Sequence, residues 1–134
     1  MPSNVVPIKV FLVDDHGHVL WGLQKLIEGE WPRMVVAGTA QTMAQALAGM
    51  RERSPDVVVL DIQLGEHNTL DHMAELVYSH GPEVVILTGV DNADLHQRAL
   101  ESGARAVVLK QEPAEVLLGE IERANEFRDA GVNR

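Results

Sequence analysis

The sequence predicts an α/β fold in which a doubly wound, five-stranded parallel sheet is flanked by five helices. Short runs that are apolar at nearly every position are typical of strands buried on both faces of a parallel sheet. Longer segments whose apolar residues recur at helical spacing separate these runs. The alternation is strict along the chain, and strands joined through helices by right-handed crossovers form a parallel sheet covered on both faces.

The first two strand–helix pairs occupy the N-terminal part of the chain. The first expected strand is Ile8–Val13 (I-K-V-F-L-V). A helix is expected over Val19–Glu28, because its leucine and isoleucine residues recur at helical spacing before Trp31-Pro32 breaks the pattern. The second strand is Met34–Gly38, and the second helix is the alanine-rich segment Thr42–Arg53, which has a narrow apolar face.

The middle of the chain supplies the third strand and helix and the fourth strand. The third strand is Val57–Leu60 (V-V-V-L), which begins after the breaker Ser54-Pro55-Asp56. A polar loop is expected over Gly65–Thr69, followed by a helix over Leu70–Tyr78 whose apolar residues share one face. The fourth strand is expected at Val84–Leu87.

Two helices and one strand complete the predicted alternation. The fourth helix is Asp91–Ser102, which begins with residues suited to a helix start and stops at Gly103. The fifth strand is Ala106–Leu109. The last helix is Pro113–Phe127, with its proline near the first turn, where the missing N–H is tolerated.

The composition narrows the class of protein. We expect a single domain over residues 1–134, with its core at about 7–127 and no output domain. The absence of cysteine excludes disulfides, thiolate nucleophiles and zinc sites of the cysteine type. The net charge of −9 argues against direct binding to nucleic acid or to an anionic membrane. Because no targeting signal or membrane-spanning run is found, a cytoplasmic location is expected.

Three carboxylates follow two of the expected strands. Asp14 and Asp15 come directly after the first strand, and Asp61 comes directly after the third. The carboxyl ends of parallel strands share one edge of the sheet, where ligands bind. Because like charges at such an edge repel unless a cation or shared protons relieve them, the cluster predicts a bound metal ion.

Two further strand ends add a hydroxyl and an ammonium to this edge. Thr88 follows the fourth strand and Lys110 follows the fifth. A carboxylate that can attack phosphorus, a divalent cation, a hydroxyl and an ammonium are the groups that phosphoryl transfer needs, and Asp61 would be the nucleophile. Each residue alone has an ordinary explanation as a cap or an exposed side chain, whereas their combination at four strand ends does not. Glycine-rich nucleotide-binding motifs are absent after the first strand, so a Rossmann or P-loop interpretation loses its main support.

Four short motifs, in this order and at these strand ends, resemble one known family. They are V-D-D at Val13–Asp15, V-V-L-D at Val58–Asp61, L-T-G at Leu87–Gly89, and G-A-R-A-V-V-L-K at Gly103–Lys110. From Ile8 to about Phe127 the chain resembles the receiver domain of a two-component response regulator, which has a flavodoxin-like fold. The D-D-H at Asp14–His16 is also similar to receivers that are joined to a helix-turn-helix DNA-binding domain.

The resemblance implies a Mg²⁺ site. Asp15 and Asp61 would ligate the ion, with the backbone carbonyl of Gln63 as a third protein ligand and Asp14 acting mainly through water. Such a donor set suits Mg²⁺, which prefers octahedral oxygen coordination and keeps several waters.

The resemblance also implies phosphorylation of Asp61 by a histidine kinase or a phosphotransfer protein. Lys110 would pair with Asp61 and then hold a phosphoryl oxygen, and Thr88 would turn inward to hydrogen-bond the phosphoryl group. Gln63 and Val90 would set the lifetime of the phosphorylated state, which would be limited by slow self-dephosphorylation. Output would pass to an output domain or target protein, or through a homodimer, by a face formed by the fourth helix, the fifth strand and the last helix.

Several positions depart from the family pattern. The aromatic residue that usually stands three positions before the lysine is Val107, which has no ring to swing on activation. Gln111 stands where a proline usually follows the lysine, so a trans loop of different shape is expected. In the loop after Asp61, Leu64-Gly65 replaces Met-Pro and Asn68-Thr69 replaces Asp-Gly, which predicts a looser loop.

Two alternative functions remain open. A haloacid-dehalogenase-type phosphatase also uses an aspartate nucleophile with Mg²⁺, but it normally needs a second aspartate where Gln63 stands. An interaction module that keeps the pocket but lacks the switch is favoured by Val107 and the altered loops. The six histidines, His16 among them, show no convincing metal pairing and are expected to be solvated.

Overall fold

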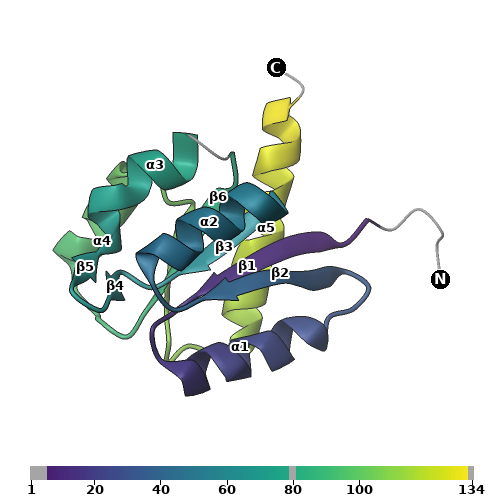
Figure 1. Cartoon of the computed structure of the whole chain (residues 1–134), viewed down its shortest axis with the longest axis horizontal. Coiled ribbons are helices and arrows are strands. Elements are labelled where there is room, and N and C mark those ends of the chain that lie inside the picture. The colour runs from purple at the N-terminus through teal and green to yellow at the C-terminus, as the bar shows by residue number, and fades with distance from the viewer. Residues whose placement is uncertain (1–5, 79–80, 133–134) are drawn as a thin grey trace.

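Five parallel strands form the central sheet of the computed structural model, which describes residues 6–78 and 81–132 (Figure 1). The strand order is β2-β1-β3-β6-β7, with every neighbouring pair parallel. The predicted doubly wound sheet is therefore confirmed. The strands are β1 (Ile8–Val13), β2 (Met34–Ala40), β3 (Val57–Leu60), β6 (Glu83–Thr88) and β7 (Ala106–Leu109).

Five α-helices cover the two faces of the sheet. The apolar residues of β1 alternate between two separate cores, because successive strand side chains point to opposite faces. Helices α2, α3 and α4 pack over one core, and α1 and α5 pack over the other; in Figure 1, α2 crosses in front of the strands and α5 runs behind them. The helices are α1 (Gly17–Glu28), α2 (Met43–Arg53), α3 (Met73–Tyr78), α4 (Ala93–Glu101) and α5 (Ala114–Val132).

The strand order places the predicted site at the point where the winding of the sheet reverses. Strand β1 lies between β2 and β3, and Val13 at the end of β1 is paired with Leu60 at the end of β3. The next residues along the two strands, Asp14 and Asp61, therefore leave the sheet side by side. In open parallel sheets the crevice at such a switch point is where ligands bind.

Tight packing of one aromatic ring fixes β1 against its neighbours. The Phe11 side chain is 1% exposed and fills the space beside Gly38 of β2 and Gly49 of α2. A Cβ atom would lie 2.7 Å from this ring at Gly38 and 2.5 Å from it at Gly49. Both glycines are therefore required by close approach, and they let α2 lie close to the strand that carries the acidic pair.

The segment after β3 differs from the polar loop that we predicted over residues 65–69. It forms a small antiparallel hairpin of β4 (Gln63–Leu64) and β5 (His67–Asn68). The two-residue turn begins with Gly65 at φ 58°, a left-handed conformation that glycine adopts without strain. The prediction of a loose loop is thus wrong, because a glycine-led turn and backbone pairing order this segment.

The helix predicted over residues 70–78 begins instead as a 3₁₀ turn, η1 (Thr69–His72), and continues as α3. The Asn68 side chain accepts a hydrogen bond from the Leu70 amide at 3.0 Å and so starts the turn. The buried Thr69 hydroxyl donates to the backbone carbonyls of Asp61 (2.7 Å) and Ile62 (2.9 Å). Thr69 thereby ties the hairpin to the strand end that carries Asp61.

Smaller differences from the predicted boundaries concern element ends. Helix α1 starts at Gly17 rather than Val19, and α5 continues to Val132 rather than stopping at Phe127. Asn92 caps α4 by accepting from the Leu95 amide at 3.0 Å, so this helix begins after the Asp91 start that we predicted. Within the part of the chain that the structure describes, no helix has the length and apolar character needed to cross a membrane.

Candidate functional site

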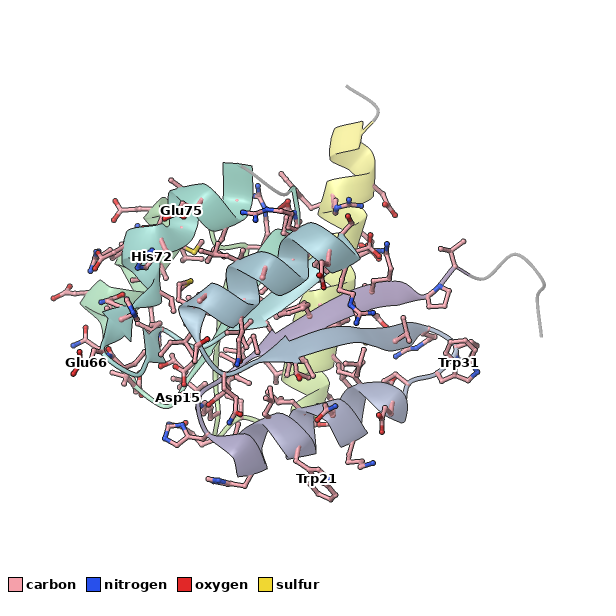
Figure 2. All side chains as sticks on the ribbon, in the orientation of Figure 1. Asp15, Trp21, Trp31, Glu66, His72 and Glu75 are labelled. Atoms are coloured by element: carbon pink, nitrogen blue, oxygen red, sulfur yellow. The ribbon has the colours of Figure 1, made fainter. Side chains whose placement is uncertain are left out.

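The carboxyl ends of four strands open into one cavity of about 340 Å³. Figure 2 labels Asp15 at the edge toward which the strands run. Acidic groups follow β1 and β3, a hydroxyl ends β6, and an ammonium follows β7, so the sequence-predicted residues are brought together. The cavity is lined by Asp15, His16, Asp61, Ile62, Gln63, Asn68, Thr88, Gly89, Val90, Leu95 and Lys110.

Lys110 links two buried carboxylates beside this cavity. Its Nζ lies 2.8 Å from Asp14 Oδ2 and 2.9 Å from Asp61 Oδ2. Asp14 is 1% exposed and Asp61 is 7% exposed, so their charges are largely withdrawn from water. Backbone pairing places the lysine, because its amide donates to the Thr88 carbonyl at 2.8 Å. One ammonium thus satisfies two carboxylates that would otherwise repel each other.

The environment of Lys110 favours its charged form. Partial burial acts to lower the pKa, but hydrogen bonds to Asp14 and Asp61, together with their negative charges, outweigh it. The pKa of Lys110 is therefore raised above its ordinary value of 10.5. The lysine stays a cation at neutral pH and is available to hold a negatively charged group that enters the cavity.

Asp15 is the incompletely satisfied member of the acidic pair. Its Oδ2 accepts a hydrogen bond from the Gly65 amide at 2.9 Å, which joins the hairpin to the site. Its Oδ1 is buried and has no hydrogen-bond partner. The Nδ1 of His16 lies 3.0 Å from Oδ1 without forming a hydrogen bond to it. A buried carboxylate oxygen without a donor is what a metal ligand looks like before the ion binds.

His16 is a site residue that we did not predict. Its backbone amide donates to Asp14 Oδ1 at 2.9 Å, and its Nδ1 lies 3.1 Å from the same oxygen. The side chain is 59% exposed, so the expectation of solvent contact is correct but incomplete. The signal in the sequence was its position directly after the acidic pair.

Gln63 and Thr88 also line the cavity. The Gln63 amide group donates from Nε2 to the Gly65 carbonyl at 2.8 Å, which holds this side chain along the hairpin. The Thr88 hydroxyl oxygen accepts from the Val90 amide at 3.2 Å and keeps its own proton for donation. Val90 is 52% exposed at the rim, and its carbonyl contacts His96 Nε2 at 2.7 Å.

The donor set fits a divalent cation. One ligand atom each from Asp14, Asp15, His16 and Asp61 lies within 4.8 Å of the others. Three of the four residues offer carboxylate oxygens, which hard cations such as Mg²⁺ prefer. The unpartnered Asp15 Oδ1 is an independent sign that the site has room for a positive charge.

The position of the expected aromatic switch is aliphatic and partly buried. Val107 lies on β7 opposite Ile86 and packs against the core beneath α2, α3 and α4. The described residues contain one cis peptide bond, Trp31–Pro32, and the chain after Lys110 is trans, as predicted. The cavity therefore has its polar groups in place, while the neighbouring strand offers no ring that could swing into it.

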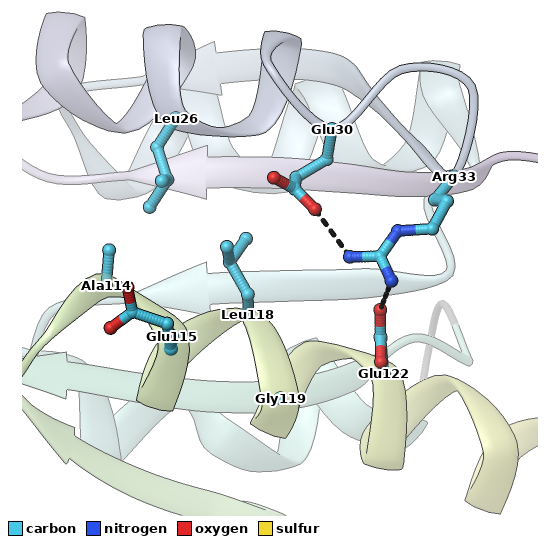
Figure 3. Close-up of a pocket in the computed structure, with 8 residues that line it drawn as sticks. All are labelled: Leu26, Glu30, Arg33, Ala114, Glu115, Leu118, Gly119 and Glu122. Carbon is cyan, nitrogen blue, oxygen red and sulfur yellow. Dashed lines mark hydrogen bonds and ion pairs between the residues drawn. The ribbon is translucent and has the colours of Figure 1, made fainter.

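A larger hollow of about 480 Å³ lies between α1 and α5, away from the strand ends (Figure 3). Leu26 and Leu118 lie on opposite sides of it. Arg33 bridges Glu30 at 2.5 Å and Glu122 at 2.8 Å, as the dashed lines in Figure 3 show. The arginine is already paired on both sides, and the hollow holds none of the predicted site residues. The chemistry indicated by the sequence therefore belongs to the smaller cavity at the strand ends.

Comparisons with known proteins agree with this geometry. The sequence profile of the response regulator receiver domain matches residues 10–122. The chain is 34% identical over 129 residues to the DNA-binding transcriptional activator DevR/DosR of Mycobacterium tuberculosis, covering 95% of this chain and 56% of that protein. It is 31% identical over 114 residues to the transcriptional regulatory protein DesR of Bacillus subtilis, covering 85% of this chain and 56% of the relative. The chain thus spans little more than half the length of either regulator.

A solved structure shows the same fold. The crystal structure of a two-component response regulator of the LuxR family from Aurantimonas sp. SI85-9A1 superposes with a TM-score of 0.83 at 28% sequence identity. The superposition covers 91% of this chain and 87% of that structure.

Proposed function

The chain belongs to the response regulator receiver domain family, and we propose that it works by accepting a phosphoryl group on Asp61. The donor would be a phosphohistidine on a sensor histidine kinase or a phosphotransfer protein. The observation that carries the proposal is the position of Lys110, a residue that lines the cavity and whose Nζ lies within 2.9 Å of both Asp61 Oδ2 and Asp14 Oδ2. A nucleophile, a cation and a hydroxyl donor then face the same small volume.

In the transfer step, a carboxylate oxygen of Asp61 forms a new bond to phosphorus while the bond between phosphorus and the donor imidazole breaks. The imidazole keeps the electron pair of the broken bond and then takes up a proton. The product on this chain is an acyl phosphate. Catalysis consists mainly of positioning and charge stabilisation, because phosphoryl transfer requires little other covalent chemistry from the protein.

The residues around Asp61 would divide the negative charge of the phosphoryl group. Lys110 would move from the two carboxylates onto one phosphoryl oxygen, and the Thr88 hydroxyl would donate its free proton to another. Asp14, Asp15, Asp61 and the Gln63 backbone carbonyl would hold a Mg²⁺ ion, with Asp14 acting mainly through water. The bound ion supplies positive charge that lowers the repulsion between the carboxylates and the incoming phosphoryl group.

The phosphorylated state would end by hydrolysis of the acyl phosphate. Receiver domains of regulators are generally not enzymes acting on other molecules, and we infer slow self-dephosphorylation here. Val90 stands exposed at the rim of the cavity, and the Gln63 side chain is held by Gly65. These two side chains would limit the approach of water and so set the lifetime of the acyl phosphate.

We further propose that residues 1–134 form one receiver domain of a transcriptional regulator. Two relatives that match almost the whole chain are named as transcriptional regulators, and each is nearly twice as long as the matched region. Output would then pass to an attached DNA-binding domain or to a partner protein, with homodimerisation as one route. The contact face would be formed by α4, β7 and α5.

A second candidate function is an interaction module that keeps this pocket but responds weakly to phosphorylation. Val107 supports it, because an aliphatic side chain packed against the core cannot report the state of Thr88 by swinging inward. The two candidates share the same chemistry at Asp61 and differ in how strongly the rest of the domain responds to the phosphoryl group.

The test of the proposed chemistry is to incubate the purified chain with acetyl phosphate and Mg²⁺ and to measure its intact mass. We expect one added phosphoryl group, no addition in Asp61→Asn, and normal addition in Glu52→Gln, a matched change of an exposed carboxylate on α2. An unmodified parent chain would refute phosphoacceptance. An adduct that persists in Asp61→Asn would place the acceptor at another residue.

A further inference from the structure

We propose that His16 is a direct nitrogen ligand in the metal site, so that the pocket holds transition ions such as Mn²⁺ and Co²⁺ more tightly than Mg²⁺. The inference rests on the proposed function only in placing a divalent ion beside Asp14, Asp15 and Asp61. It concerns which ions the pocket selects, whereas the proposed function concerns what happens at Asp61.

The His16 imidazole lies beside the carboxylates of the candidate metal site. His16 Nδ1 lies 3.1 Å from Asp14 Oδ1 and 3.0 Å from Asp15 Oδ1, so it already faces the two carboxylates of the acidic pair. One ligand atom each from His16, the acidic pair and Asp61 lies within 4.8 Å of the others. The nitrogen is thus part of the same small donor set and does not belong to a separate surface group.

Local backbone structure makes this position reproducible. His16 is the residue before the first turn of α1, with an extended backbone at φ −94° and ψ 109°. Its amide donates to Asp14 Oδ1 at 2.9 Å, which ties the backbone of the candidate ligand to a neighbouring ligand. Such a hydrogen bond orients a ligand before the ion arrives.

Asp15 contributes an incompletely satisfied oxygen to the donor set. Its Oδ1 is buried without a hydrogen-bond partner even though His16 Nδ1 lies only 3.0 Å away. The hydrogen bond of His16 Nδ1 goes to Asp14 Oδ1 at 3.1 Å and leaves Asp15 Oδ1 without a donor. Release of the proton on Nδ1 would free this nitrogen to bind an ion that Asp14 and Asp15 share.

Ligand chemistry then predicts the selectivity. Imidazole nitrogen suits first-row transition ions, whereas Mg²⁺ prefers an all-oxygen octahedron and gives up its waters reluctantly. A set of one nitrogen and several carboxylate oxygens should therefore bind Mn²⁺ and Co²⁺ with higher affinity than Mg²⁺. Without the nitrogen, the remaining oxygens should still hold Mg²⁺ about as well as before.

The experiment measures metal binding directly on the tag-free chain. Isothermal titration calorimetry gives the affinities for Mn²⁺ and for Mg²⁺ of the parent, His16→Asn and His18→Asn. His18 is the control, because it is a neighbouring histidine outside the donor set. We expect His16→Asn to weaken Mn²⁺ binding by about ten- to hundredfold while Mg²⁺ binding barely changes, and His18→Asn to leave both unchanged. Pulsed electron paramagnetic resonance of bound Mn²⁺ should show a nitrogen coupling that disappears only in His16→Asn.

The opposing results are distinct. Equal loss of Mn²⁺ and Mg²⁺ affinity in His16→Asn, no loss, tighter binding of both ions, or absence of nitrogen coupling in the parent would each overturn the inference. Asp15→Asn should lower the affinity for both ions, which would show that the titrations report binding in this pocket. Mass analysis after acetyl phosphate treatment in Mg²⁺ decides the proposed function separately, since it does not depend on how Mn²⁺ binds.

Discussion

The strand-end pocket and the neighbouring strand β7 differ in the side chains that they present. The pocket has charged and hydrogen-bonding groups, whereas β7 has an aliphatic residue where a responsive group would be expected. In the pocket, Lys110 pairs with two carboxylates, Asp15 keeps one oxygen unpartnered, and Thr88 keeps a proton to donate. Close by on β7, Val107 is packed among apolar side chains and carries no group that could respond to them.

From this contrast we expect the chemistry of the pocket and any conformational output to respond to different substitutions. The pocket depends on charges that must be satisfied locally, so a change at one of its residues affects all the others. The packing around Val107 depends on shape, and an aliphatic side chain leaves no polar atom unsatisfied there. Substitutions in the two regions should therefore differ in size and in kind.

The largest effect is expected from Lys110→Met, which removes the cation between Asp14 and Asp61. The free energy of unfolding without divalent ions should fall by about 3 kcal/mol, because two buried carboxylates then face each other without a counter-charge. Urea unfolding measures this loss. Saturating Mg²⁺ should restore part of it, since the ion supplies the missing charge.

The control for this substitution is Lys25→Met. Lys25 forms an exposed pair with Glu28 on α1, where an ion pair is worth less than about 1 kcal/mol. A Lys110→Met variant that is no less stable than Lys25→Met would show that the buried carboxylates do not need the lysine.

A smaller effect is expected from Thr69→Val, which tests the link between the hairpin and the pocket. The valine keeps the shape of threonine but loses the hydroxyl that donates to the Asp61 and Ile62 carbonyls. We expect a loss of about 2 kcal/mol in urea unfolding, together with slower phosphorylation by acetyl phosphate. Thr69→Ser keeps the hydroxyl and should stay closer to the parent in rate, so equal rates for the two variants would count against this role.

Val107→Phe tests the output side of the comparison. We expect it to cost about 1 kcal/mol through overpacking while leaving acyl phosphate formation intact. Hydrogen exchange of α4, β7 and α5, measured with and without phosphorylation, should differ more in the variant than in the parent. Val107→Ile enlarges the side chain without adding a ring. If the difference in hydrogen exchange increased equally in that variant, the ring would not be what couples the pocket to α4, β7 and α5.

The smallest effect is a pH dependence that reports the charge on Lys110. Its pKa is raised above 10.5 in the folded chain, so its stabilising contribution is complete below about pH 10.5 and is lost as pH rises through the folded-state pKa. The difference in unfolding free energy between the parent and Lys110→Met should therefore be constant near neutrality and should shrink only above pH 10.5. A difference that already shrinks near neutral pH would point to another titrating group.

The strand positions could be predicted from the sequence because buried parallel strands are apolar at almost every residue. The end of each apolar run also identified the polar residues at the strand ends, which are Asp14, Asp61, Thr88 and Lys110. The hairpin after Asp61 was not predicted, since Gln63–Asn68 is short, polar and without alternation. Thr69 was likewise missed, because its role depends on carbonyl groups that come close only in the folded chain.

The sequence by itself determined which groups stand at the strand ends, because hydrophobicity patterns are local and are read within a few residues. Only the tertiary structure decided which ends are neighbours. The order β2-β1-β3-β6-β7 sets Asp14 beside Asp61 and brings Lys110, 49 residues after Asp61, within 2.9 Å of it. The contact of His16 with the acidic pair also depends on the tertiary structure, because the path of the chain into α1 sets where the imidazole lies. Strand pairing and chain direction are properties of the whole sheet, and no short segment encodes them.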